Sequence, residues 1–328
     1  MNPIAEKVLA GDVQATARLL RDVDDRRLGV TEILKDLYPH TGRAYTIGVT
    51  GAPGTGKSTL VDRMVGSLRQ QDRTVGVLAV DPTSPLSGGA ILGDRIRMNR
   101  HCLDQGVFIM SLATRGLFGG LTRSILSAID ILDAMGKDCV IVETVGVGQG
   151  EVNVAMSVHT TVIVVNPGMG DGVQALKAGL LEVGDIYVVN KADREGVEAT
   201  VNDLSLMIDL DYNQREKPGW KPPIVKTQAL MDQGITELFE FIDSHRNYIR
   251  RHENSLNLRK RKERVRKELT EMVKECLLEN IMTRIMADGM FEREVTAILE
   301  GRIDPYTATE SLVRNCRSDS AMNSTDKR

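Results

Sequence analysis

The stretch Gly-Ala-Pro-Gly-Thr-Gly-Lys-Ser at positions 51–58 decides the fold of this chain. It matches the phosphate-loop pattern GxxxxGK[ST], and it stands between an apolar run at 45–50 and a helical pattern at 60–68. Glycines let the backbone wrap closely around an anion, and the N-terminus of the following helix directs amides at that anion. The sequence therefore predicts a nucleotide-phosphate site made of Gly51, Ala52, Pro53, Gly54, Thr55, Gly56, Lys57, Ser58 and Thr59.

Two side chains of this loop have separate predicted roles. Lys57 is expected to neutralise the β and γ phosphates and is therefore a candidate catalytic residue. Ser58 is expected to ligate magnesium through its hydroxyl. A chance glycine-rich turn is the alternative interpretation, and the strand-loop-helix setting argues against it.

Outside the loop, seven short apolar runs alternate with helical stretches. Continuous apolar strands separated by helices are typical of a parallel sheet that is covered on both faces and binds its ligands at the carboxyl ends of its strands. The predicted fold is an α/β P-loop NTPase with a mostly parallel central sheet, flanked by N- and C-terminal helical extensions. The runs lie at 45–50, 74–81, 107–112, 138–143, 160–166, 185–190 and 222–227.

The chain is expected to have three parts. Residues 1–40 show three short helical patterns and form an N-terminal helical extension, and residues 41–254 form the nucleotide-binding domain. Residues 255–328 form a C-terminal helical dimerisation arm and tail, with a long amphipathic helix that starts near residue 259. Its apolar stripe is free either to dock on the core or to pair with a second copy; the stripe consists of Val265, Leu269, Met272, Cys276, Ile281 and Ile285.

Three acids are candidate magnesium-side residues, namely Asp81, Asp94 and Glu143. Magnesium prefers oxygen ligands and is often held through water by carboxylates at the ends of neighbouring strands. Glu143 opens Glu-Thr-Val-Gly, which resembles a DxxG loop with Glu in place of Asp, and Gly146 is placed to offer its amide to the γ-phosphate. This loop and residues 82–97 are therefore candidate switches. The alternatives are structural or helix-capping acids, or, for Asp94, an ordinary ion pair with a neighbouring arginine.

Phosphoryl transfer needs positioning and charge stabilisation more than a general base, and no residue stands out as such a base. Arg115, between Thr114 and Gly116, is a candidate internal arginine finger, and a structural surface arginine is the alternative. The predicted catalytic residues are Lys57, Asp94, Glu143, Gly146 and Arg115. Slow intrinsic hydrolysis is expected.

The four residues Asn190-Lys191-Ala192-Asp193 follow an apolar run and match the guanine-specificity pattern NKxD. Asp193 can accept two hydrogen bonds from the ring NH and exocyclic amine of guanine, whereas adenine would leave that carboxylate unpaired. Lys191 is expected to lie along the base, and Asn190 is expected to brace the loop. A helix N-cap is the alternative. The predicted ligands are GTP or GDP together with Mg²⁺.

Composition argues against nucleic acid and membranes as partners and indicates the compartment. The net charge of −3 gives no general electrostatic case for nucleic acid or an anionic membrane as the main partner. The four cysteines are widely spaced, which is typical of a protein from a reducing compartment. No run of about 18 apolar residues occurs, so the expected location is the cytoplasm.

With these residues in place, the chain resembles the methylmalonyl-CoA mutase-associated (MeaB/ArgK-type) GTPases. The resemblance runs from about residue 2 to 315 and is carried by GAPGTGKST, by 80–98, by TRGLFGGL at 114–121, by ETVGVGQGEV at 143–152 and by NKAD. It implies a G-protein chaperone that gates adenosylcobalamin delivery to an acyl-CoA mutase and protects that enzyme. It also implies a homodimer through C-terminal helices and a weak GTPase activity that the mutase stimulates.

Several positions depart from the family pattern. Gly172-Val173 stand where an acid and Leu usually follow, and His159-Thr160-Thr161 replace a segment that usually carries an acid. The last base-contacting loop, usually Ser-Ala, reads Gln228-Ala229; the amide of Ala229 is expected to contact guanine. These departures suggest a divergent branch that serves a mutase other than the methylmalonyl enzyme.

Two other functions are compatible with parts of the pattern. An ATP-using kinase linked to amino-acid transport is one, and NKAD argues against it. A metal-delivery GTPase is the other; it would need a thiol or imidazole site, and only His101 and Cys102 are adjacent.

Overall fold

The computed structural model describes residues 1–25, 27–81, 99–101, 103–113, 120–144, 157–168, 183–214, 219–251, 258–287 and 289–322. The chain forms two compact units, Met1–Arg264 and Val265–Arg328. The three-part division at residues 40 and 254 stays a prediction.

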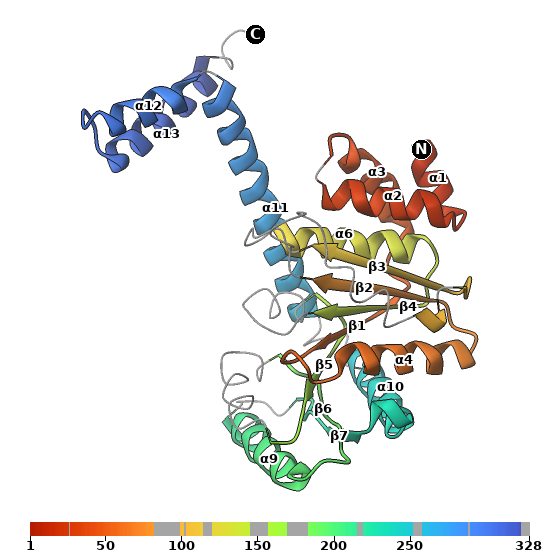
Figure 1. The fold of residues 1–328 in the computed structure, drawn as a ribbon. Coiled ribbons are helices and arrows are strands. Elements are labelled where there is room, and N and C mark those ends of the chain that lie inside the picture. The colour runs from red at the N-terminus through yellow and green to blue at the C-terminus, as the bar shows by residue number, and fades with distance from the viewer. Residues whose placement is uncertain are drawn as a thin grey trace. The chain divides into compact units, whose positions relative to one another are not determined.

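A seven-stranded parallel sheet forms the centre of the first unit (Figure 1). Its strand order is β3-β2-β4-β1-β5-β6-β7, and all seven predicted runs are confirmed as strands. The order places β1, which leads into the phosphate loop, in the middle of the sheet, where strands are covered on both faces and rich in Val and Ile. The strands are β1 Tyr45–Thr50, β2 Val75–Asp81, β3 Val107–Ala113, β4 Cys139–Thr144, β5 Thr160–Val165, β6 Ile186–Asn190 and β7 Ile224–Thr227.

Helices α4 (Lys57–Gln70) and α10 (Ile235–Arg251) cover one face of the sheet. Leu60, Met64 and Leu68 of α4 pack into the same buried cluster as Ile47 and Val49 of β1. The helix is longer than the predicted 60–68 because Gly56, in the left-handed conformation, is its N-cap, so Lys57 and Ser58 belong to the first turn. The phosphate-binding side chains are thereby fixed to a buried helix.

Helix α6 (Gly120–Ala134) covers β2, β3 and β4 on the other face, and α9 (Val197–Gln214) covers β5 and β6 (Figure 1). The three N-terminal helices pack on α6 and share its core through residues such as Leu19, Leu20 and Leu37. They are α1 Pro3–Leu9, α2 Val13–Asp24 and α3 Val30–Leu37. The 3-10 turn η1 (Tyr38–His40) follows α3. The Asp133 carboxylate of α6 accepts hydrogen bonds from the backbone amides of residues 42–44, which lead into β1.

The second unit is helical. The predicted long helix is α11 (Leu258–Ala287), whose first residues still belong to the first unit. Two further helices that were not predicted separately are α12 (Met290–Leu299) and α13 (Pro305–Met322). Ile285 and Leu312 are buried there among Ile281, Met282, Met290 and Phe291. Asp304 caps α13, because its side chain accepts hydrogen bonds from the amides of Tyr306 and Thr307, both at 2.9 Å. Among the described residues of the whole chain, no helix combines the length and apolar character needed to cross a membrane.

Candidate functional site

The phosphate loop joins β1 to α4, and its glycines are required by its backbone conformation. Gly51, Gly54 and Gly56 have φ of 144°, 80° and 92°, which side-chain-bearing residues rarely adopt. A Cβ at Gly51 would stand 2.0 Å from the carbonyl oxygen of Val164 in β5, so the loop lies directly against that strand. The loop is therefore held in one shape by the strand beside it.

Lys57 lies inside this loop. It is 7% exposed, and its Nζ donates hydrogen bonds to the carbonyl oxygens of Gly51 (2.7 Å) and Ala52 (3.1 Å). A buried ammonium is a strong local positive charge, because little water screens it. The geometry agrees with the predicted role of Lys57 in neutralising phosphate.

Side chains at the ends of β5 and β6 hold the loop carbonyls from outside. The oxygen of Gly54 accepts from Asn166 Nδ2 (3.1 Å) and Lys191 Nζ (2.7 Å), and the oxygen of Thr55 accepts from Asn190 Nδ2 (2.8 Å). In a planar trans peptide, the N–H of the next residue points opposite to the carbonyl. The amide of Gly56 therefore points away from Asn190.

Asn166 is a residue of this site that the sequence analysis missed. It follows β5 in the way that Asn190 ends β6, and it is 5% exposed. Its position in the sequence could have indicated it, because an asparagine ends the apolar run at 160–166 just as Asn190 ends the run that leads into NKAD. Within the described part of the chain, its buried Oδ1 has no hydrogen-bond partner, so only its amide nitrogen holds the loop.

Ser58 and Glu143 meet beside the phosphate loop. The Ser58 hydroxyl donates a hydrogen bond of 2.6 Å to Oε1 of Glu143, and both residues are buried. Glu143 is placed there by β4, where it pairs with Val49 of β1 and Ala79 of β2. A hydroxyl and a carboxylate are the oxygen ligands that magnesium prefers, so these two residues fit that ion.

Several other predicted residues lie wholly or partly outside the described residues. Asp81 ends β2, and its backbone pairs with Ala113 of β3, but its side chain is not among those described. Asp94, Arg115 and Gly146 lie outside the described ranges, as does the Gly172-Val173 departure. Their roles stay predictions.

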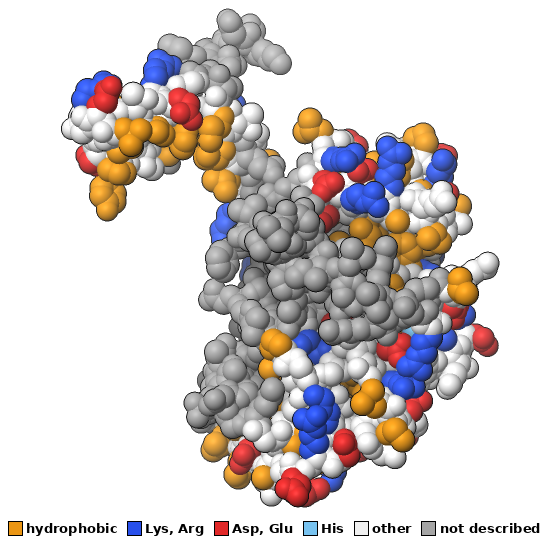
Figure 2. All heavy atoms as spheres, viewed as in Figure 1, with side chains coloured by type: hydrophobic (Ala, Val, Ile, Leu, Met, Phe, Trp, Pro, Cys, Tyr) orange, Lys and Arg blue, Asp and Glu red, His pale blue; other side chains and the backbone are white. Residues whose placement is uncertain are grey.

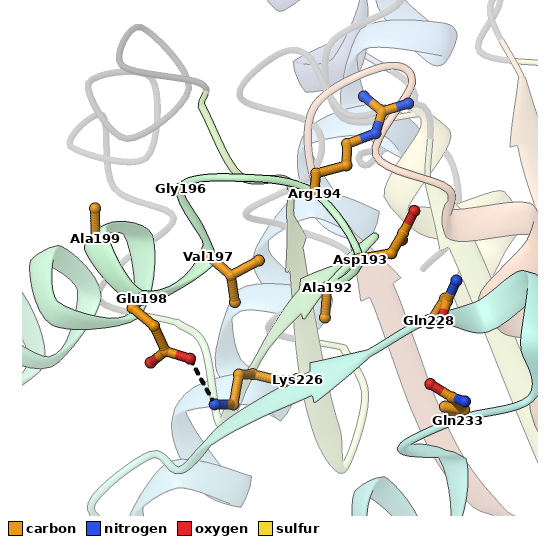
Figure 3. A pocket seen from close by; sticks show the side chains of 10 residues that line it. All are labelled: Ala192, Asp193, Arg194, Gly196, Val197, Glu198, Ala199, Lys226, Gln228 and Gln233. Atoms are coloured by element: carbon orange, nitrogen blue, oxygen red, sulfur yellow. Dashed lines mark hydrogen bonds and ion pairs between the residues drawn. The ribbon is translucent and has the colours of Figure 1, made fainter.

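A pocket of about 670 Å³ opens beside NKAD (Figure 3). Asp193 and Gln228, both predicted nucleotide contacts, line it. Lys226 and Glu198 form a 2.9 Å ion pair at the pocket, drawn as the dashed line in Figure 3. The lining residues are Ala192, Asp193, Arg194, Gly196, Val197, Glu198, Ala199, Lys226, Gln228 and Gln233.

The side chain of Asn190 connects the NKAD segment with β7, with Ala229 and with the phosphate loop. Its Oδ1 accepts from Thr227 Oγ1 (3.0 Å) and from the amide of Ala229 (3.1 Å), while its Nδ2 reaches the phosphate loop. Ala229 is buried, and in this structure its amide is bonded to Asn190, so a guanine contact by that amide stays a prediction. The predicted role of Asn190 in bracing the guanine-binding loop stays a prediction.

A transition-metal site has little support in the described part of the chain. Those residues contain no group of three His, Cys, Asp or Glu that could hold a metal ion. Burial raises the pKa of the Cys139 thiol to about 12, so this cysteine stays protonated rather than acting as a thiolate ligand. His101 Nε2 faces Asp62, and Cys102 lies outside the described residues.

The chain is similar in sequence to several known proteins. A protein of Pyrococcus abyssi is 45% identical over 315 residues, which is 96% of each chain. The GTPase ArgK of Escherichia coli is 32% identical over 288 residues, 86% of this chain and 85% of ArgK. The mouse methylmalonic aciduria type A homolog, a mitochondrial protein, is 31% identical over 276 residues, 84% of this chain and 66% of the mouse protein.

A solved structure has the same fold. The crystal structure of an LAO/AO transport system kinase superposes with a TM-score of 0.66 at 24% identity, covering 97% of this chain and 99% of the other. The family described as methylmalonyl Co-A mutase-associated GTPase MeaB matches residues 17–286, which include all seven strands, the phosphate loop and NKAD. The chain therefore belongs to the MeaB family of guanine-nucleotide-binding P-loop proteins and is a GTP hydrolase.

Proposed function

We propose that this GTP hydrolase acts as a G-protein chaperone that gates adenosylcobalamin loading of an acyl-CoA mutase, methylmalonyl-CoA mutase or a related enzyme, and protects it. The observation that carries this proposal is the family match over residues 17–286, because the family is described by its association with methylmalonyl-CoA mutase. The cobalamin belongs to the partner enzyme in this proposal.

The site supports the nucleotide part of this cycle through residues with distinct tasks. Asp193 reads guanine from the pocket beside NKAD, and Lys57 stabilises the charge that develops on the phosphates. Magnesium, when bound, supplies positive charge at the β and γ phosphates. Ser58 and Glu143 would hold it, with Asp81 and Asp94 as further proposed ligands. Arg115 and Gly146 are proposed to stabilise the transferring phosphoryl group.

A second copy of the chain is the proposed partner of the C-terminal helical unit. Figure 2 shows hydrophobic side chains gathered on this unit, and the large ones that are exposed include Leu269, Leu277, Leu278, Leu299 and Tyr306. Exposed apolar side chains in such number mark an interaction surface more often than a solvated one. The sequence stripe that begins at Val265 contributes to this surface.

Calorimetric titration of GTP, GDP and ATP in the presence of Mg²⁺ tests the nucleotide assignment. Asp193→Ala should weaken guanine-nucleotide binding at least roughly 100-fold, because two charge-assisted hydrogen bonds are lost. Asp203→Ala, at an exposed carboxylate of α9, is the matched control and should bind as the unmodified protein does. Tight ATP binding that Asp193→Ala leaves unchanged would contradict the guanine assignment.

The chaperone role needs its own measurement. Adenosylcobalamin loading of a purified acyl-CoA mutase is followed spectroscopically with the protein and GTP, with the protein and GDP, and with Lys57→Ala and GTP. We expect loading to depend on the nucleotide and to lose that dependence in Lys57→Ala. Loading that is the same in all three mixtures, for both methylmalonyl-CoA mutase and a related mutase, would exclude the proposed role while leaving the GTPase assignment intact.

A further inference from the structure

Asp62 is a buried acid of α4 that the nucleotide site does not use. It stands four residues after Ser58, and its side chain is 4% exposed. Residues at this spacing lie on the same side of a helix. Because a buried carboxylate is costly unless it is paired, its partners are informative.

Within the described part of the chain, the residues that contact the Asp62 side chain come from one short turn, η2 (Asn99–His101). Arg100 Nη2 is hydrogen-bonded to Oδ2 of Asp62. His101 Nε2 lies 3.3 Å from Oδ1 and 3.2 Å from the backbone carbonyl oxygen of the same residue. The ring of His101 also lies near Gly66, where a Cβ would stand 3.9 Å from Cε1. Asp62 therefore contacts two consecutive residues of η2: its carboxylate binds Arg100, and its backbone carbonyl is hydrogen-bonded to His101. Among the described residues, its Oδ1 has no hydrogen-bond partner, although His101 lies beside it.

The position of this turn in the chain links these contacts to the candidate switch. η2 lies in the connection between β2, which ends at Asp81, and β3, which begins at Val107, and the same connection contains the candidate switch residues 82–97. The helix that carries Asp62 begins with Lys57 and Ser58. Arg100 and His101 are thus held on α4 about one helical turn from Lys57 and Ser58.

We propose that Asp62, Arg100 and His101, here called the Asp62 anchor, position the β2–β3 connection against α4 for GTP hydrolysis. Rates of phosphoryl transfer depend on placement, and a displacement of about 1 Å far from the reacting atoms can lower a rate roughly 100-fold. These three are positioning residues, because none of them is placed in contact with the nucleotide. The inference rests on the GTP hydrolase activity and not on the identity of the mutase.

Arg100→Met is the first test, because Asp62→Asn alters a buried group and can unfold α4 by itself. The Arg100 side chain is 53% exposed, so its replacement leaves little empty volume. We expect single-turnover hydrolysis at saturating Mg²⁺ and GTP to slow roughly 10- to 100-fold. GDP affinity should change by less than about twofold. The urea unfolding midpoint should change little. Arg100→Lys should recover part of the rate because it keeps the positive charge.

The matched control is Arg27→Met, at an exposed arginine that pairs with Asp22 in the N-terminal helices; its hydrolysis rate should be unchanged. A second variant, His101→Asn, should slow hydrolysis without weakening GDP binding. The proposal is overturned if Arg100→Met lowers the unfolding midpoint but keeps the hydrolysis rate, which would make the cluster purely structural. It is also overturned if GDP and GTP binding weaken equally while the rate at saturation is retained.

Discussion

The hydroxyl of Ser58 donates a 2.6 Å hydrogen bond to Oε1 of Glu143, although 85 positions separate the two residues in the chain. The contact exists because β4, which carries Glu143, is the neighbour of β1, which leads into the phosphate loop. It places a serine hydroxyl and a carboxylate within reach of the same cation.

Glu143→Gln tests this relationship. The amide still accepts a hydrogen bond from Ser58, but the negative charge that would attract Mg²⁺ is gone. We expect the Mg²⁺ concentration for half-maximal GTP hydrolysis to rise roughly 10- to 100-fold, with little change in GDP binding measured without Mg²⁺. Glu32→Gln, at an exposed acid of α3 paired with Lys35, is the control. An unchanged Mg²⁺ midpoint would show that Glu143 is not on the metal side.

Asn166→Ala removes one of the two donors to the carbonyl of Gly54. Loss of a typical hydrogen bond costs about 0.5–1.5 kcal/mol, so GTP and GDP should both bind roughly 2- to 10-fold more weakly in a calorimetric titration. Asn202→Ala, at an exposed residue of α9, should bind normally. A loss confined to GTP would argue that Asn166 acts on the γ-phosphate side instead of on the loop.

Two glycines of the phosphate loop should respond differently to the same substitution. At Gly54, with φ of 80°, a Cβ meets nothing within 4 Å, so Gly54→Ala should cost only about 1–2 kcal/mol of backbone strain. At Gly51 a Cβ would stand 2.0 Å from the Val164 carbonyl, so Gly51→Ala should lower the free energy of unfolding further and abolish nucleotide binding. Equal losses in urea unfolding would contradict the close contact between the loop and β5.

Asp104 gives the first unit an acid-sensitive contact. The hydrogen bond from Arg69 Nε (2.8 Å), followed by the one from the amide of Gly106, lowers the pKa of the Asp104 carboxyl. The resulting stabilisation is therefore complete above the ordinary Asp pKa of about 3.9 and is lost as pH falls through the lower folded value.

Asp104→Asn should accordingly reduce the difference in unfolding free energy between about pH 6 and about pH 3 by about 0.5–1 kcal/mol. Urea unfolding at the two pH values measures this difference. Both partners are partly exposed, so the effect should also decrease at high salt. An identical pH dependence in the unmodified protein and the variant would remove Asp104 as its source.

Local sequence patterns were sufficient to predict the strands and the two nucleotide-binding motifs. The strands were predictable because buried parallel strands read as short apolar runs, and the phosphate loop was predictable because its glycines and Lys57 are adjacent in the chain. NKAD was recognised for the same reason. The helices α12 and α13 were not separated, because their apolar residues form a small core only together with the end of α11.

The α/β phosphate-loop fold could be predicted from the chain alone, and so could the position of the GxxxxGK[ST] and NKxD motifs, because each depends on neighbours within a few positions. The distant side chains that contact these motifs became visible only in the folded chain. Asn166 reaches Gly54 across 112 positions, Asn190 reaches Thr55 across 135, and Arg100 reaches Asp62 across 38. These contacts depend on strand order and helix packing, which bring residues together by burying apolar surface and leave no local signal in the chain.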